Sequence, residues 1–426
     1  MVKRLRSVST LSGRGVSVNS RWQQLNDWLF ELRDLWLPAP FMDPEPAWTR
    51  VWPELAELMA GLSDEQCSDL EEDAVTLVAL VAEALPALAA YPQLVSLEEL
   101  APADDEVAGA TLPEVRATDM PGRKRLQAGA FTAAISPLDK PVLDWCCGKG
   151  HLSRTLAARC PADVQGLEWN PELVREGNRL AERFGDPVTV HCQDVMDDGL
   201  ALDESRHGVA LHACGDLHRQ LLRRGAQAGL SRISLSPCCY HLTTKGRYQP
   251  MSQSGRGHRP ELSVTASDLR LAVRETVTAP TRVREQTKRM TLWRLGFDGL
   301  QRHLRGVDEY LPVPSSPTRL LHEGFGAFCR WAACERELVL PEDTDFQHWL
   351  DYGERRMKSV RRYELLRHLF RRPLELWMLF DYVLYLEEQG YQVRVGEFCS
   401  RTLTPRNLLI DAIRVYDTPP VPRSHP

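Results

Sequence analysis

The segment that decides the fold reads Pro141-Val142-Leu143-Asp144-Trp145-Cys146-Cys147-Gly148-Lys149-Gly150-His151-Leu152-Ser153. Its apolar start predicts a buried β-strand ending in an acidic residue, and its glycines predict a tight turn into a helix over residues 152–159. Such a unit places backbone N–H groups at the carboxyl edge of a parallel sheet, where anionic or nucleoside ligands bind. The spacing D-x-C-x-G-x-G matches neither the phosphate-binding loop nor the dinucleotide fingerprint. The alternative is an ordinary strand–helix turn of another doubly wound domain.

Four more short strands alternate with helices, which predicts a mainly parallel sheet. These strands cover residues 163–170, 187–195, 208–214 and 232–236. Glu168 ends the first of them, 24 positions after Asp144, where a carboxylate can accept hydrogen bonds from both ribose hydroxyls. Asp194 ends the next strand and can accept from an adenine amino group while Val195 packs on the ring. Taken singly, a strand-end acid can equally cap a helix.

The glycine segment resembles the first motif of S-adenosylmethionine (SAM) methyltransferases, with Cys146 in place of the first glycine. With three further segments it resembles a methyltransferase-like family that has bacterial and eukaryotic members and is distantly similar to tRNA 2′-O-ribose methyltransferases. These segments are His212-Ala213-Cys214-Gly215-Asp216-Leu217, Cys238-Cys239-Tyr240-His241 and Thr404-Pro405-Arg406-Asn407-Leu408. The resemblance implies a Rossmann-like fold and SAM as methyl donor. With the helical spacing of apolar residues over residues 21–118, the expected fold class is α/β, a Rossmann-like class I methyltransferase sheet with an N-terminal helical domain.

The cofactor contacts are expected on ten residues of this region. They are Lys124, Asp144, Cys146, Gly148, Gly150, His151, Glu168, Asp194, Val195 and His212. Met120–Lys124 is similar to the family's basic element before the first strand. The His-Glu pair expected shortly after that element stands here as Leu126-Gln127.

The catalytic residues are expected in the segment after the fifth strand. A hydroxyl or ammonium acceptor must lose a proton, and His241 is the candidate base because imidazole titrates near neutrality. Tyr240 could orient the acceptor, while Cys238 or Cys239 could attack a pyrimidine ring as a nucleophile. Lys245 is a further candidate base. The alternative for His241 is a neutral histidine hydrogen-bonded at a strand end.

The 11 cysteines contain no C-x-x-C pair and no zinc-finger spacing, so we expect no structural metal site. Reduced thiols in a cytoplasmic protein are the simpler interpretation. If the first, fourth and fifth strands lie side by side, however, several Cys and His residues gather at one sheet edge and could bind a metal. They are Cys146, His212, Cys214, Cys238 and His241. Otherwise these residues simply line the pocket.

Charge is unevenly distributed along the chain. Residues 1–115 carry 7 Lys/Arg and 20 Asp/Glu, a net −13, and residues 116–426 carry 45 and 38, a net +7. Residues 219–305 carry 17 basic and 5 acidic residues, a net +12. A basic stretch beside a catalytic pocket can bind the phosphates of RNA, although it can also be a solvated helix surface. The acidic N-terminal region could contact a protein partner.

The organisation is predicted as five consecutive parts. They are a flexible tail (1–20), an acidic helical domain and linker (21–118), a SAM-binding core (119–300), a C-terminal helical and sheet-completing region (301–415) and a disordered tail (416–426). Helical spacing over Ser63–Ala90 predicts a helix, and Ala74–Tyr91 is apolar but too interrupted to span a membrane. Gln392–Glu397 and Leu408–Val415 are expected strands. Tyr248–Pro260 is expected to be a loop that acts as a lid or as a substrate clamp.

Two function classes follow from these observations. The first is an active methyltransferase, whose acceptor could be structured RNA such as tRNA, a protein or a small molecule. The second is a non-catalytic protein that keeps the SAM fold as a binding or scaffold module. The glycines and strand-end acids predict cofactor binding and do not distinguish the two classes.

Overall fold

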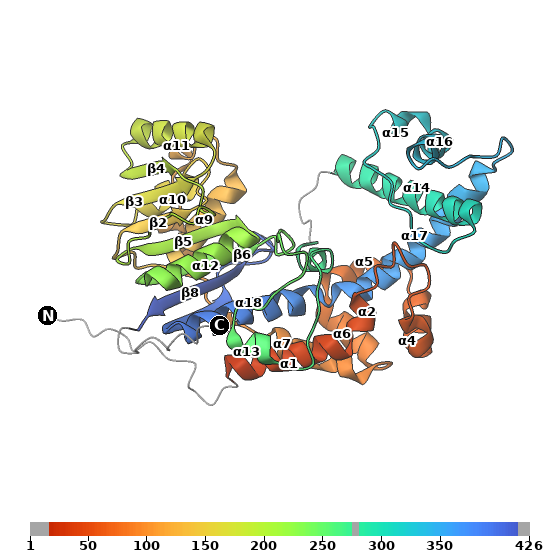
Figure 1. Cartoon of the computed structure of the whole chain (residues 1–426), viewed down its shortest axis with the longest axis horizontal. Helices are drawn as coiled ribbons and strands as arrows, with labels where there is room; N and C mark the ends of the chain where they lie inside the picture. The colour runs from red at the N-terminus through yellow and green to blue at the C-terminus, as the bar shows by residue number, and fades with distance from the viewer. Residues whose placement is uncertain (1–16, 275–280, 416–426) are drawn as a thin grey trace. The chain divides into compact units, whose positions relative to one another are not determined.

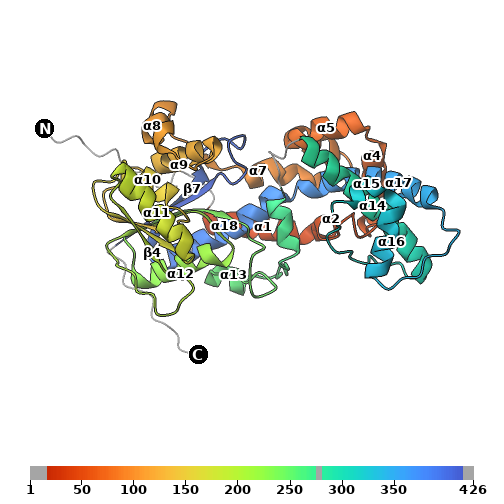
Figure 2. The ribbon, with the colours of Figure 1, turned by 90° about the horizontal axis from the view of Figure 1, so that it is seen from above.

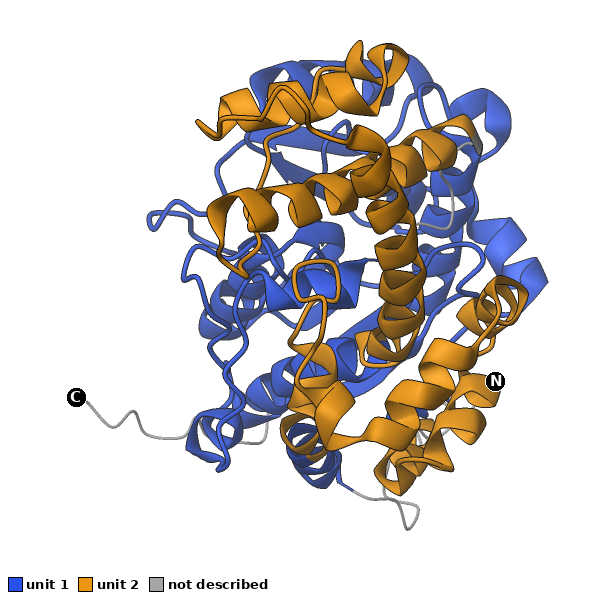
Figure 3. Cartoon of the chain, turned by 90° about the vertical axis from the view of Figure 1, so that its right-hand side faces the viewer, with its two compact units in different colours: residues 1–27, 94–277, 372–426 blue, residues 28–93, 278–371 orange. Residues whose placement is uncertain are grey.

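The structure is a computed structural model that describes residues 17–274 and 281–415. The chain forms two compact units, shown in different colours in Figure 3. Unit 1 comprises residues 1–27, 94–277 and 372–426, and unit 2 comprises residues 28–93 and 278–371. Parts of the predicted tails, residues 1–16 and 416–426, lie outside the described residues. The two units interleave along the chain, whereas the sequence predicts consecutive segments.

Unit 1 contains an eight-stranded sheet with the order β1-β7-β8-β6-β5-β2-β3-β4 (Figure 1). The strands are β1 (Glu98–Glu99), β2 (Val142–Trp145), β3 (Val164–Glu168), β4 (Val188–Cys192), β5 (His207–Cys214), β6 (Arg232–Cys238), β7 (Tyr391–Glu397) and β8 (Leu408–Arg414). The pairs from β4 through β6 are all parallel, as is the β1–β7 pair, and β8 runs antiparallel to both of its neighbours. The predicted α/β fold with a mainly parallel sheet is confirmed, including the two late strands that complete the sheet.

Helices cover both faces of this sheet. The helical elements that lie wholly inside unit 1 are α8 (Asp104–Ala110), α9 (Gly122–Ala134), α10 (His151–Ala157), α11 (Pro171–Phe184), α12 (Asp216–Ala228) and α13 (Gln253–Gly257), with the 3-10 turns η2 (Glu114–Arg116) and η3 (Asp268–Val273). Figure 2 shows α9 and α10 on one side of the sheet and α12 on the other. Phe131 of α9 and Leu156 of α10 are fully buried in one core cluster with Val142 and Val164 of the strands.

Unit 2 is helical throughout its described part. Its elements are α2 (Arg33–Trp36), α3 (Trp48–Val51), α4 (Pro53–Gly61), α5 (Asp64–Glu72), α6 (Ala74–Ala82), η1 (Pro86–Ala90), α14 (Thr281–Arg305), α15 (Leu320–Glu323), α16 (Phe325–Glu335) and α17 (Phe346–His368). Helices α1 (Val18–Glu31), α7 (Tyr91–Val95) and α18 (Arg371–Glu388) run across the boundaries between the units. The core of unit 2 includes Trp293, Phe297 and Phe328.

The stretch Ser63–Ala90, predicted to be helical, is divided into the helices α5 and α6 and the 3-10 turn η1. The side chain of Asp73 accepts hydrogen bonds from the backbone N–H groups of Val75 and Thr76 and so starts a new helix there. Pro86 then begins the 3-10 turn η1. Local capping therefore overrides the apolar periodicity. Among the described residues, no helix is both long and apolar enough to cross a membrane.

A buried ionic network joins the carboxy-terminal strands to the rest of the sheet. Asp411 of β8 accepts two hydrogen bonds from Arg232 of β6, at 2.7 and 2.9 Å, and one from Arg394 of β7 at 2.6 Å. Ser234 of β6 also donates to Asp411 at 2.7 Å, and His207 Nε2 of β5 lies 2.7 Å from the Ser234 hydroxyl. One carboxylate therefore connects four adjacent strands.

We expect Asp411→Ala to destabilise unit 1 by about 3–5 kcal/mol, because it leaves Arg232 buried without its partner. Asp198→Ala is the control, since Asp198 is exposed and its pair with Arg224 should contribute less than about 1 kcal/mol. Urea denaturation at neutral pH measures both free energies of unfolding. Similar values for the two variants would contradict a structural role for the network.

The carboxylate of Asp411 should also make the free energy of unfolding depend on pH. Burial raises the pKa of Asp411, but hydrogen bonds and charge from Arg232 and Arg394 outweigh burial and lower it to about 2. Because the unfolded value is about 3.9, this stabilisation is complete above that pH and is lost as the pH falls toward 2.

Candidate functional site at the carboxyl edge of the sheet

The turn between β2 and α10 is built from left-handed backbone. Cys146, Gly148 and Gly150 have φ values of 59°, 59° and 67°. The N–H of Cys147 donates to the carbonyl of Leu167 on β3 at 3.0 Å, which fixes the turn against the neighbouring strand. Cys146 therefore adopts the conformation that glycine supplies most easily, although it carries a side chain.

Glu168 at the end of β3 holds this turn in place. Its two carboxylate oxygens accept the backbone N–H groups of Gly148 at 3.0 Å and Asn170 at 2.9 Å. The side chain is buried, with 5% of the residue exposed. Each oxygen retains a second lone pair, so the carboxylate is already oriented at the sheet edge where the ribose contacts are predicted.

Asp144 lies beneath the turn and does not reach its surface. It is 1% exposed, and the hydroxyl of Ser153 donates to it at 2.6 Å. Burial raises the pKa of Asp144 to about 7, despite the hydrogen bonds from Ser153 that lower it. This residue therefore positions α10 against β2, a connection that the sequence pattern did not indicate.

The loops after β3 and β4 form the next part of the edge. Asp194 is exposed and accepts the N–H of Met196 at 2.8 Å, while Val195 is buried. Trp169 directly follows Glu168 and is 71% exposed, and Met196 is 42% exposed. Neither side chain was predicted from the sequence; for Trp169 the available signal was a large apolar residue directly after a strand-end acid.

The predicted contacts on the other side of the turn are partly assembled. His212 has a left-handed φ of 67° and its Nε2 contacts the side-chain amide of Gln127 on α9. Burial lowers the pKa of His212 to about 4, with a further contribution from Arg406 and Lys124. Burial also lowers the pKa of His151, whose Nδ1 is buried without a hydrogen-bond partner. Lys124 is exposed and lies close enough to act electrostatically on both histidines.

The end of β5 is irregular, and this irregularity brings three thiols together. The register between β5 and β6 shifts between Leu211 and Cys214, so that Cys214 pairs with Cys238. The sulfur atoms of Cys214, Cys238 and Cys239 all lie within 4.8 Å of one another. Hydrogen bonds from the Cys214 and Cys238 thiols lower the pKa of Cys239. The other three residues of the predicted metal set, Cys146, His212 and His241, do not join this group within the described residues.

The two remaining catalytic candidates occupy different environments. Tyr240 is only 3% exposed, its ring packs edge-on against His218 of α12 at 5.8 Å, and its hydroxyl is buried without a partner. This burial differs from the predicted contact with an acceptor. His241 is partly exposed, and its Nδ1 is buried without a hydrogen-bond partner.

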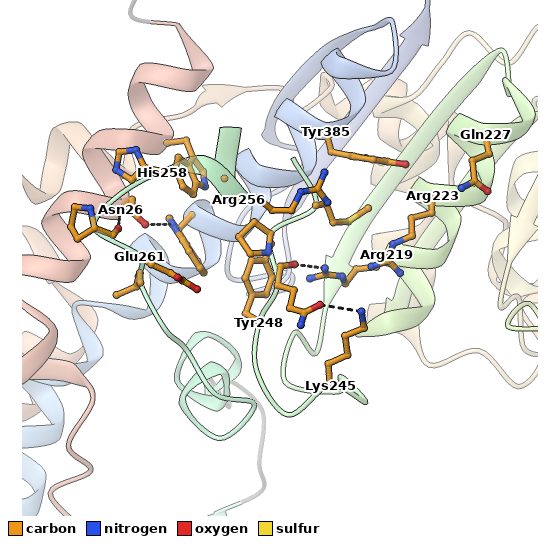
Figure 4. Close-up of a pocket in the computed structure, with 18 residues that line it drawn as sticks. Asn26, Arg219, Arg223, Gln227, Lys245, Tyr248, Arg256, His258, Glu261 and Tyr385 are labelled. Carbon is orange, nitrogen blue, oxygen red and sulfur yellow. Dashed lines mark hydrogen bonds between the residues drawn. The ribbon is translucent and has the colours of Figure 1, made fainter. Parts of the chain in front are cut away.

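A cavity of about 510 Å³ lies elsewhere in unit 1, beside α12 (Figure 4). Four cationic side chains and four aromatic ones line it: Arg219, Arg223, Lys245, Arg256, Trp22, Tyr248, Trp377 and Tyr385. Arg219 donates to the carbonyl of Gln249 at 2.5 Å and lies over the Tyr248 ring at 4.8 Å. Its Nε is buried without a partner. Glu261 belongs to the same lining, so the cavity combines an excess of positive charge with flat apolar surfaces.

Tyr248–Pro260 differs from the lid-like loop that the sequence predicts. The hydroxyl of Tyr248 and the backbone N–H groups of Met251 and Ser252 all donate to Asp381 of α18, at 2.7, 2.7 and 3.0 Å. Residues 253–257 form the short helix α13. A buried carboxylate thus anchors the segment as a wall of the cavity, because it satisfies backbone groups that a free loop would present to water.

Residues 131–246 match a protein family described as "methyltransferase domain", which spans α9 to the segment after β6. No match is found among curated proteins. The match supports a methyltransferase domain in unit 1, and it includes the glycine turn, Glu168 and the thiol group.

Three solved structures illustrate the structural similarity. The tRNA (uracil-54, C5)-methyltransferase of Pyrococcus abyssi, in complex with S-adenosyl-L-homocysteine, is 18% identical over 27% of this chain and 29% of that chain, with a TM-score of 0.23. The precorrin-6y C5,15-methyltransferase of Geobacter metallireducens is 17% identical over 28% and 65%, with a TM-score of 0.24. The YcgJ protein of Bacillus subtilis is 18% identical over 25% and 48%, with a TM-score of 0.23. This chain thus spans 29% to 65% of these three structures.

The strained backbone at Cys146 can be tested with a pair of variants. We expect Cys146→Gly to be more stable than Cys146→Ala by about 1 kcal/mol, because a left-handed residue with a Cβ costs about 1–2 kcal/mol and glycine's extra freedom in the unfolded chain offsets about 0.4–1 kcal/mol of that. Both variants remove the thiol, so their difference isolates the backbone. Chemical denaturation measures it, and equal stabilities would show that the turn is not strained.

Proposed function

We propose that this protein is a SAM-dependent methyltransferase whose acceptor is structured RNA. The observation that carries the first half is the glycine turn held by the Glu168 carboxylate at the carboxyl end of adjacent parallel strands. Ligands of open α/β sheets bind at this edge, next to the switch in strand order. Here β2 is the switch point, since β3 lies on one side of it and β5 on the other.

The residues at this edge fit the parts of SAM. A Cβ built on Gly148 would meet no atom within 4 Å, so the turn faces open space where a ligand can approach the backbone. Glu168 has lone pairs for ribose hydroxyls, and the exposed Trp169 offers a flat surface for adenine. Asp194 and Val195 would contact the same base. Bound SAM would supply an electrophilic methyl group.

The residues after β5 and β6 would then position the acceptor. His241 would accept the proton that the acceptor loses, since it is partly exposed and its buried Nδ1 has no partner. His212 has its pKa lowered to about 4 by burial and nearby cations, so it stays neutral and can orient groups by hydrogen bonding. Alignment of the acceptor with the methyl group is the larger part of what the protein must contribute.

The charge and shape of the cavity beside α12 favour RNA as the acceptor. Arg223 and Arg256 line the cavity, and neither forms an ion pair within residues 17–274 and 281–415. Cationic grooves with aromatic side chains bind unpaired bases by stacking while they neutralise phosphates. His218 and Arg219 are neighbours on α12, and they contact Tyr240 and the cavity wall respectively. The cavity is therefore linked through α12 to the segment that carries His241.

Cofactor binding is tested with two matched glycine variants. Gly148→Ala should weaken SAM and S-adenosylhomocysteine binding at least about tenfold, or about 1.4 kcal/mol, because its methyl group enters the ligand space. Gly185→Ala is the control, since Gly185 has a similar φ of 65° and equally open surroundings but ends α11. Calorimetry measures both affinities. Wild-type protein that ignores both ligands, or equal losses in both variants, would refute the cofactor site.

The RNA proposal predicts both binding and methyl transfer. Wild-type protein should transfer labelled methyl groups from SAM into a tRNA pool. The double variant Arg223→Ala/Arg256→Ala should bind that RNA more weakly and with a shallower salt dependence, by about one unit of slope per lost phosphate contact. The control is Arg175→Ala/Arg183→Ala on the exposed side of α11.

The outcomes separate the function classes. SAM binding without transfer to RNA, protein or metabolite fractions would favour a non-catalytic module. Label found in protein or metabolites alone would identify one of these classes as the acceptor instead of RNA. RNA binding that is insensitive to salt would contradict a phosphate-binding role of the cavity.

A further inference from the structure

The thiols at the ends of β5 and β6 are arranged more closely than pocket lining requires. The sulfur atoms of Cys214 and Cys238 lie 3.6 Å apart, and the sulfur of Cys239 completes a triangle with sides below 4.8 Å. A disulfide would need about 2.05 Å, and all three cysteines are free. In tetrahedral zinc sites the Zn–S distance is about 2.3 Å, which places neighbouring sulfurs about 3.8 Å apart. The separation of Cys214 and Cys238 is close to this value, and the sulfur of Cys239 lies within 4.8 Å of both.

The backbone on each side of the group is held in unusual conformations that produce this convergence. His212 and Cys239 both lie in the left-handed region, with φ values of 67° and 48°. The shift in register before Cys214 turns its side chain toward Cys238, as β-bulges commonly do beside functional sites. Non-glycine residues keep such backbone only where the surroundings impose it.

Contacts between the two loops that carry the cysteines hold the backbone in these conformations. The N–H of Gly215 donates to the carbonyl of Cys238 at 3.1 Å, and the N–H of Asp216 donates to the carbonyl of Leu242 at 2.9 Å. A Cβ on Gly215 would lie 2.0 Å from that Leu242 oxygen, so the two loops touch without room for a side chain. Two loops that are distant in sequence thus fix the three sulfurs relative to one another before any ligand is bound.

We propose that Cys214, Cys238 and Cys239 together bind one zinc ion at the carboxyl ends of β5 and β6. Thiolates are soft ligands that select zinc among the common divalent ions. Binding forms three zinc–sulfur bonds and transfers the three thiol protons to solvent. The chain then supplies three ligands, which leaves the fourth tetrahedral position to water or to an acceptor, as in zinc sites that take part in chemistry.

Zinc ligation is an alternative to the nucleophilic role predicted for Cys238 and Cys239, since a thiolate that shares a lone pair with zinc is a weaker nucleophile than a free thiolate. It does not depend on the proposed methyltransferase function, because the three sulfurs converge without any cofactor. It also explains why three thiols meet at a sheet edge where the sequence has no zinc-finger spacing: two of the ligands are adjacent, and the third comes from the neighbouring strand.

The experiment uses the full chain, purified under reducing conditions. Elemental analysis should find about one zinc per chain. After chelation removes the zinc, one equivalent of Co²⁺ should produce a sulfur-to-cobalt charge-transfer absorption. Cys214→Ser should lose at least about tenfold in Co²⁺ affinity and most of this absorption. Cys192→Ser is the control, because Cys192 is an exposed thiol at the end of β4 and lies outside the group.

Wild-type protein without stoichiometric zinc and without the absorption would overturn the proposal, and this readout does not depend on the folding of any variant. Copper in place of zinc would overturn the identity of the ion. Equal losses in Cys214→Ser and Cys192→Ser would also contradict the site. Loss of SAM binding in Gly148→Ala protein that retains one zinc would show that the zinc site and the cofactor site are separate.

Discussion

The sheet of unit 1 depends on a single buried carboxylate. Asp411 accepts from Arg232, Ser234 and Arg394, and through Ser234 it also reaches His207. Two arginines beside one another would repel if this charge were absent, and burial of an unpaired guanidinium is costly. The network lies near the start of β6, so it sets the position of that strand, whose far end carries the thiols and His241. The position of the site therefore depends on an ion pair at the opposite end of β6.

The functional edge is a consequence of parallel pairing. The carboxyl ends of β2, β3, β5 and β6 meet at one edge because each of these strands runs in the same direction as its neighbour. The chain leaves this edge through left-handed residues, which include Cys146, His212 and Cys239. Each such residue with a Cβ costs about 1–2 kcal/mol, so the edge stores strain that the packed core must offset.

Burial divides the polar residues of the edge into two kinds. Asp144 and Glu168 are almost fully buried, and their carboxylates orient the glycine turn and α10 through hydrogen bonds. Lys124, Trp169 and Asp194 are exposed around the same turn. The first kind gives the site its shape, and the second kind offers the surface that a ligand could contact.

The sequence by itself determined the local elements of this protein. The glycine turn, the strands of the core and the two late strands were predictable because each depends on short-range periodicity, on glycine and on β-branched residues. The fold class and the positions of Asp144, Glu168 and His241 at strand ends followed from the same signals. The role of Asp144 did not, because its burial and its bond to Ser153 depend on how α10 packs.

Only the tertiary structure decided which distant residues meet. It paired residues 28–93 with residues 278–371 in one unit. It also anchored Tyr248–Ser252 on Asp381 of α18. Neither pairing was predictable, because contacts between remote segments leave no periodic pattern in either segment. From the five residues that the sequence placed at one edge it brought together Cys214 and Cys238, and it added Cys239 as the third thiol. A register shift at the end of β5 sets Cys214 opposite Cys238, and such a shift depends on the packing of neighbouring strands and loops, which no spacing of cysteines along the chain can specify.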